Sequence, residues 1–305
     1  MKLPLRLSIP VVFCYALGYP IGALAVQAIS PGPVLVLRFG VSAPVLLLMA
    51  ARRGVRWPRG WLLAHVAVAG LLIQAVQFIG CYEALRLGLS PVLTALIISM
   101  NPMVTAAFAW FLLGERLTGR RAGALALAVT AVFVAFAGQL GSASIGVGAS
   151  AVTVALFGLS LGGVYQQRFV RGVDPVLATG IGVLVSIPAA VVFALTTPMH
   201  LYRPQQAFWS VGAMIVSSSL IGMSLFLAAL RRGGAGQVSM LFAVIPSVAA
   251  VVSWMLLGER LDFGVLGGLA IGAAACLLGR RSQRLPVRAR PGGTARRQRT
   301  SAIIR

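Results

Sequence analysis

The chain has 305 residues, of which 59% are hydrophobic and only 10% are charged, and its formal net charge is +21. A soluble domain of this length would carry roughly a quarter charged residues. The composition therefore excludes a single water-soluble globular domain and predicts an all-α membrane protein. Its three cysteines stand singly in apolar stretches, which predicts neither a metal site nor a disulfide framework.

Ten apolar segments follow one another along the chain, each close to the length that a bilayer requires. The first follows Lys2 and Arg6 and has features of a signal peptide, but a matching helix at 156–170 argues that it remains part of the fold. The predicted transmembrane helices lie at about 8–28, 33–51, 61–82, 90–113, 121–138, 150–167, 176–196, 207–229, 236–257 and 264–279.

Two closely similar stretches lie on opposite halves of the chain. Residues 98–117 read ISMNPMVTAAFAWFLLGERL, and residues 242–261 read FAVIPSVAAVVSWMLLGERL, at a constant offset of 144 residues. This similarity predicts a duplication, with a first five-helix repeat over 1–140 and a second over 141–280. The remaining segment, 281–305, is rich in arginine and has no acidic residue, which predicts a disordered basic tail.

Charge placement predicts the orientation of the helices. With the N-terminus in the cytoplasm, 22 of the 26 cations fall in cytoplasmic segments, and only Arg86, Arg203 and Arg260 fall outside. Because each repeat has an odd number of helices, the second enters the membrane from the opposite side, so the two five-helix repeats are inverted. The same bias explains the basic charge without nucleic acid, and anionic lipid is the expected partner of the tail.

Several motifs between about residues 8 and 280 carry a family resemblance. They are the proline-containing fourth helix that ends in Leu-Leu-Gly-Glu-Arg-Leu, the Leu-Arg-Phe at 37–39 and the Tyr-Glu-Ala-Leu-Arg at 82–86. Together they resemble the EamA-type carriers of the drug/metabolite transporter superfamily. The resemblance implies a bacterial inner-membrane protein that moves small polar metabolites or drugs, often outward. It also implies a central cavity surrounded by the first, third, fourth, sixth, eighth and ninth helices.

Polar side chains inside the predicted helices are the candidates for that substrate cavity. A lipid-facing amide is costly, which favours cavity lining for the glutamines, whereas hydrogen bonding between helices is the alternative for the serines. The cavity candidates are Tyr15, Tyr19, Gln74, Gln77, Asn101, Tyr165, Ser217 and Ser224.

Arg38 and Glu83 are predicted at a similar depth near the outer face of the membrane. The seventh and eighth predicted segments contain no ionisable residue at the matching places. The joint absence favours a pair that closes the outer side or binds a charged substrate. Glu83 is also the acid expected to carry a coupling proton.

Two pairs of residues that recur in both repeats are further candidates for gating or coupling. Pro102 and Pro246 each free a helix carbonyl, and the bend is either a static kink or a hinge. Glu115 and Glu259 stand where a helix meets water, either as part of an interfacial ion pair or as members of a gate network.

The sequence contains no GxxxxGK[ST] motif and no catalytic constellation, so we expect neither an ATP-driven pump, an enzyme nor a cofactor. The leading hypothesis is a secondary transporter that exports small molecules by alternating access. The alternative is an uncoupled facilitator or channel of the same fold, and a membrane enzyme or receptor is disfavoured. The sequence leaves a homodimer open.

Overall fold

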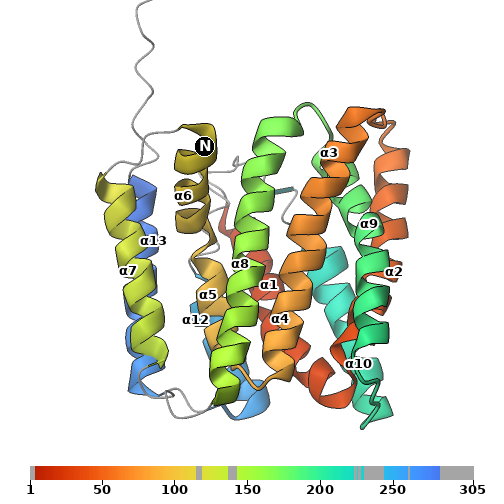
Figure 1. Cartoon of the computed structure of the whole chain (residues 1–305). Coiled ribbons are helices and arrows are strands. Elements are labelled where there is room, and N and C mark those ends of the chain that lie inside the picture. The colour runs from red at the N-terminus through yellow and green to blue at the C-terminus, as the bar shows by residue number, and fades with distance from the viewer. Residues whose placement is uncertain are drawn as a thin grey trace, which may run out of the picture.

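A computed structural model of the chain describes residues 4–114, 119–136, 143–222, 225, 228–229, 244–259 and 262–281. These residues form one helical bundle (Figure 1). Within them no strand is formed, and a single isolated β-bridge joins Ile29 to Leu201. The prediction of an all-α protein is therefore confirmed for the part of the chain that is described.

The first half of the chain forms three single helices and two membrane-length helices that are interrupted. Trp61–Arg86 is one continuous span with a π-helical middle, and Pro91–Leu113 is a second that is broken at Met100. The elements are α1 (Leu5–Ala28), α2 (Pro31–Arg52), α3 (Trp61–Gly70), the π-helix η1 (Leu71–Val76), α4 (Gln77–Arg86), α5 (Pro91–Ser99), α6 (Asn101–Leu113) and α7 (Gly119–Phe136).

The second half contains α8 (Ala143–Phe169), α9 (Pro175–Thr196), α10 (Pro204–Met214), the π-helix η2 (Ile215–Gly222), α12 (Ile245–Leu257) and α13 (Phe263–Arg281). Over the described residues of the whole chain, six helices are long and apolar enough to cross a membrane, and three shorter apolar helices accompany them. The predicted multi-pass architecture is confirmed. The predicted number of ten helices stays a prediction, because the eighth and ninth segments lie partly outside the described residues.

The 144-residue offset of the sequence also relates the helices. The helices α2 and α9 begin at Pro31 and Pro175 and have 22 residues each, and η1 and η2 begin at Leu71 and Ile215. The helices α6 and α12 have 13 residues each and end at glycines whose φ angles are 65° and 64°. Glycine adopts this left-handed conformation without steric cost, so the repeated Leu-Leu-Gly motif ends both helices at the same place.

Equivalent helices of the two halves pack against each other in opposite directions. The start of α2 meets the end of α9, where Gly32 abuts Ala194, and the start of α7 meets the end of α13, where Gly123 lies beside Leu278. The helix α1 begins and α13 ends at the upper end of the bundle (Figure 1). This antiparallel packing is the arrangement that inverted repeats require.

Pro102 acts differently from a proline inside a continuous helix. The helix α5 ends at Ser99, the N–H of Met100 donates to the carbonyl of Ile97 at 3.1 Å, and Pro102 lies in the first turn of α6. A first-turn proline loses no helical hydrogen bond, because that N–H would have no helical partner anyway. Pro246 has the same place in α12. Pro102 thus starts a half-helix after a break, which is a sharper interruption than a kink, and Pro246 lies in the first turn of α12.

Candidate functional site

Arg38, a cation in the membrane-spanning part of α2, is held by aromatic side chains of α4. Its Nη1 donates to the hydroxyl of Tyr82 at 3.2 Å, and its guanidinium carbon lies 4.0 Å from the centroid of the Phe78 ring. A cation over an aromatic face gains about 0.5 to 2 kcal/mol, which helps α2 to keep an arginine in the bilayer. The buried Tyr82 hydroxyl also contacts Sδ of Met214 in α10, so this cluster joins the two repeats.

Glu83 pairs with Arg86 and not with Arg38, which corrects the pairing expected from the sequence. Arg86 Nε donates a hydrogen bond to Glu83 Oε2 at 2.8 Å, and its Nη2 donates a second hydrogen bond to Oε1. The two residues are three positions apart and share a helix face, whereas Tyr82, the neighbour of Glu83, turns toward Arg38. The pair is partly exposed at the end of α4. A gating or coupling role for Arg38 or Glu83 stays a prediction.

Tyr15 and Tyr19 of α1 lie at the junction of the two repeats, where α1 contacts α5 and α12. Both rings are half-buried and pack on a small apolar cluster that includes Ala95 of α5 and Ala249 of α12. The structure therefore brings two of the predicted cavity residues together at this junction.

The side chain of Asn101 makes structural hydrogen bonds in this conformation. Its Oδ1 accepts hydrogen bonds from Ser160 of α8 at 2.9 Å and from Thr105 at 3.0 Å. Ser160 is fully buried, so the bond fastens the beginning of α6 to α8. In the second repeat the equivalent position is Ile245, which has no such group. Cavity lining by Asn101 stays a prediction.

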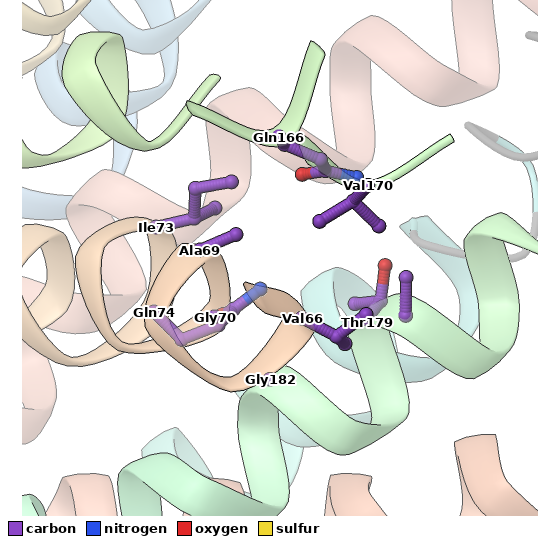
Figure 2. A pocket seen from close by; sticks show the side chains of 10 residues that line it. Val66, Ala69, Gly70, Ile73, Gln74, Gln166, Val170, Thr179 and Gly182 are labelled. Atoms are coloured by element: carbon purple, nitrogen blue, oxygen red, sulfur yellow. The ribbon is translucent and has the colours of Figure 1, made fainter. Parts of the chain in front are cut away.

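A small hollow lies between α3, α8 and α9 (Figure 2). Figure 2 shows the amides of Gln74 and Gln166 and the hydroxyl of Thr179 around it. Gly182 on its wall is the residue 144 positions after Arg38. Its backbone touches that of Gly70, so neither position has room for a side chain. The hollow is therefore the second repeat's counterpart of the place that Arg38 fills in the first.

Tyr165 belongs to a cluster next to the hollow, one position before Gln166, which lines it. Its hydroxyl lies 2.7 Å from Nδ1 of His65, and the His65 ring stacks on Phe169 with centroids 4.9 Å apart. His65 and Tyr165 are 100 positions apart and no sequence motif links them, so only the structure shows this contact. The arrangement places a polar hydrogen bond at the same end of the bundle as Arg168, which donates to the carbonyl of Leu112 at 3.0 Å.

The two π-helices are structural features that the sequence did not reveal. They lie in the third and eighth predicted segments, they begin 144 residues apart, and they contain Gln74 and Ser217. A π-turn changes the register of the side chains that follow, so the α-helical spacing that put Gln74 and Gln77 on one face does not apply across η1. Gln74 is buried and Gln77 half-buried. The Ser217 hydroxyl is buried without a hydrogen-bond partner.

The predicted residues Ser224 and Glu115 lie outside the described residues. Glu259 is described, at the end of α12, with one carboxylate oxygen buried and without a hydrogen-bond partner. No group of three or more metal-ligating side chains occurs among the residues that the structure describes.

Comparison with known proteins connects this arrangement to a family. The profile of the EamA-like transporter family matches the chain twice, over residues 5–137 and 146–279. The chain belongs to the EamA-like transporter family. The resemblance drawn from the sequence motifs is thereby confirmed, and the matches cover both repeats of this membrane transporter.

Curated relatives of this EamA-like transporter are also transporters. The uncharacterized transporter YyaM of Bacillus subtilis is 25% identical over 260 residues, which are 79% of this chain and 82% of that protein. The S-adenosylmethionine/S-adenosylhomocysteine transporter of Chlamydia trachomatis serovar D is 25% identical over 285 residues, 87% of this chain and 85% of its own. A solved crystal structure covers 90% of this chain and 98% of its own with a TM-score of 0.63 and 19% identity, a likeness of fold alone.

Proposed function

We propose that this EamA-like transporter is a secondary carrier that exports small polar metabolites or drugs across the bacterial inner membrane by alternating access. The observation that carries the proposal is the antiparallel packing of equivalent helices, such as α2 with α9 and α7 with α13. Two halves with the same elements in opposite orientation can exchange conformations, so that a shared site opens to one side and then to the other.

Interruptions of the helices at equivalent places support such a movement. The break before α6 recurs as the start of α12, and η1 recurs as η2. At these places the regular i to i−4 hydrogen bonds are absent or rearranged, so less energy is needed to change the local backbone angles. A hinge at Pro102 and Pro246 is therefore our interpretation of the repeated proline.

The cluster around Arg38 indicates which chemical class of solute should be tested first. A guanidinium that donates to the Tyr82 hydroxyl and lies over the Phe78 ring suits a solute that has both a carboxylate and an aromatic ring. S-adenosylmethionine, which the chlamydial relatives are named for, has both groups. It is the first probe rather than an assigned substrate.

Counterflow in proteoliposomes tests the proposal. Vesicles that contain the purified transporter are loaded with unlabelled S-adenosylmethionine and diluted into a trace of the labelled compound. A carrier accumulates the label transiently, because internal substrate accelerates the return of the binding site. An uncoupled facilitator or channel, the alternative function, shows equilibration without this acceleration. If the label does not enter at all, a resistance screen with and without overexpression identifies another solute for the same assay.

The orientation is tested separately. The charge bias predicts cytoplasmic termini and a basic tail on anionic lipid. A reporter that is active only in the periplasm should stay silent after Arg305, and single cysteines at Arg116 and Arg260 should be labelled from opposite sides. Labelling of both from one side would remove the argument for inverted repeats and for alternating access.

A further inference from the structure

Glu259 follows the end of α12, at the end of the bundle that the charge pattern assigns to the outside. Gly258 ends the helix with a φ of 64°, and the Glu259 side chain then returns toward the protein and is half-buried. Its Oε2 is wholly buried and has no hydrogen-bond partner. Burial raises the pKa of this carboxyl, and a hydrogen bond from the Ser90 hydroxyl offsets part of the increase.

Ser90 links this carboxyl to the other repeat. Its Oγ accepts hydrogen bonds from the N–H groups of Val92 at 3.1 Å and Leu93 at 3.4 Å, which caps the N-terminus of α5. A serine hydroxyl has a single proton, so the proton that Ser90 can donate is left for Glu259. The contact between α5 and α12 at this end therefore includes a buried carboxylate oxygen that lacks a hydrogen-bond donor, with the Ser90 hydroxyl near the carboxyl.

The other acidic residues that the structure describes have partners of their own. Glu83 pairs with Arg86 at the end of α4, Asp174 caps α9 through the N–H of Val176 at 2.8 Å, and Asp262 caps α13 through the N–H of Val265 at 2.7 Å. Glu83 was the acid that the sequence suggested for a proton, but its carboxylate is paired with Arg86 and partly exposed. Glu259 is the better candidate for binding a proton.

Among the residues that the structure describes, few charged groups lie around Glu259. The helices α5 and α12 contain no ionisable residue, Arg86 at the end of α4 is bound to Glu83, and Asp262 is engaged as a helix cap. Arg260 is next in the sequence and lies outside the described residues. Among the described residues, burial and the Ser90 hydroxyl are the influences found on the carboxyl.

We propose that Glu259 is a proton-binding site between the repeats, which takes up a proton when the outer ends of α5 and α12 pack together. The carboxylate gains one proton from the outer medium and becomes a neutral acid, and it returns that proton to the medium when the ends separate and water reaches it. Protonation removes the cost of burying a charge, so external acid favours a closed outer face. This inference rests on the proposed alternating access.

The sequence indicates that this site belongs to the outer face alone. Glu115 is the counterpart of Glu259 at the inner face, but the counterpart of Ser90 is Gly234, which has no hydroxyl. The two ends of the carrier therefore differ in their response to protons, so external acid lowers the population of the outward-open state but does not by itself set the direction of net transport.

Infrared spectroscopy of the purified full chain tests the site without any substrate. The chain has only five acidic residues, so few groups contribute to the carbonyl band of protonated carboxyl groups. We expect part of this band to persist well above pH ~4.3, the ordinary glutamate value, in the wild type and in the matched control Glu83→Gln. The part of the band that persists at higher pH should be lost in Glu259→Gln. A band that is unchanged in Glu259→Gln would overturn the assignment.

Accessibility of the outer face tests the coupling. In a cysteine-free background, Leu89→Cys next to Ser90 reports opening, and Met199→Cys, an exposed position of the outer connection, normalises for thiol chemistry. Normalised labelling of the cysteine at position 89 from outside should fall severalfold when the pH is lowered from about 8 to about 5. In Glu259→Gln this labelling should be as low at about pH 8 as at about pH 5. Equal normalised labelling at both pH values in the wild type would refute the coupling.

These readouts separate the two proposals. Counterflow with an unchanged infrared band in Glu259→Gln would leave a carrier without this proton site. A Glu259 band with no counterflow of any solute would leave a proton site in a protein that is not a carrier.

Discussion

A pair of double-mutant cycles decides which residue Arg38 contacts. The structure pairs it with Tyr82, whereas sequence reasoning paired it with Glu83. A hydrogen bond to a charged group contributes about 1.5 to 3 kcal/mol in soluble proteins, but bonds between membrane helices average about 0.6 and reach about 1.7 kcal/mol. The distance of 3.2 Å is at the long end of the usual range. We therefore expect a coupling free energy of about 1 kcal/mol between Arg38 and Tyr82.

The magnitude is limited by what remains after each change. In Tyr82→Phe the guanidinium keeps its position over the Phe78 ring, 4.0 Å from the centroid, so the charge is not left alone. In Arg38→Ala the Tyr82 hydroxyl keeps its contact with Met214. Neither single change therefore leaves a wholly unsatisfied group, and the measured coupling reports the bond itself.

The assay is reversible unfolding in mixed micelles of the wild type, Arg38→Ala, Tyr82→Phe and the double variant. A parallel cycle combines Arg38→Ala with Glu83→Gln, for which we expect additivity within about 0.5 kcal/mol. A cycle of Glu83→Gln with Arg86→Gln should give only about 0.3 to 0.5 kcal/mol, because that pair is partly exposed. Coupling near 1 kcal/mol with Glu83 and none with Tyr82 would refute the assigned contact and restore the sequence-based pairing.

Three further changes test the packing, the outer connection and the buried acid. Gly70→Leu should lower the unfolding free energy by about 3 kcal/mol or more in a thermal or denaturant scan, because a Cβ there meets the backbone of Gly182; Gly212→Ala, which has open space, is the matched control and should not destabilise. Ser30→Ala removes two 2.8 Å hydrogen bonds to the connection before α10 and should cost about 1 to 3 kcal/mol, with increased labelling of the outer face; unchanged labelling would show that this connection does not hold that face. Glu259 has a raised pKa in the folded state, so its stabilising contribution is present below its unfolded pKa and is lost as the pH rises through its folded pKa. Glu259→Gln should therefore be more stable than the wild type at neutral pH, and equal stability at all pH values would contradict the burial of this group.

Local sequence signals determined the class, the repeat and many helix ends of this protein. An apolar composition requires helices that satisfy their own backbone hydrogen bonds in lipid. Proline at positions 31 and 175 starts two helices, and the repeated glycine after Leu-Leu ends two others, because each effect depends on neighbours within one turn. The constant offset of 144 residues then predicted the inverted arrangement, since duplication and an odd number of helices leave no other orientation.

Tertiary structure alone decided the partners of the polar groups. Arg38 and Tyr82 are 44 positions apart, His65 and Tyr165 are 100 apart, and Ser30 and Pro198 are 168 apart. Sequence reasoning chose Glu83 for Arg38 from opposite charge and similar depth, but rotation about the helix axis, which depth does not determine, directs Tyr82 toward Arg38. The buried oxygen of Glu259 and the hollow at Gly182 arise in the same way. Each depends on which helix of the other repeat lies opposite, and that is set by packing and not by local sequence.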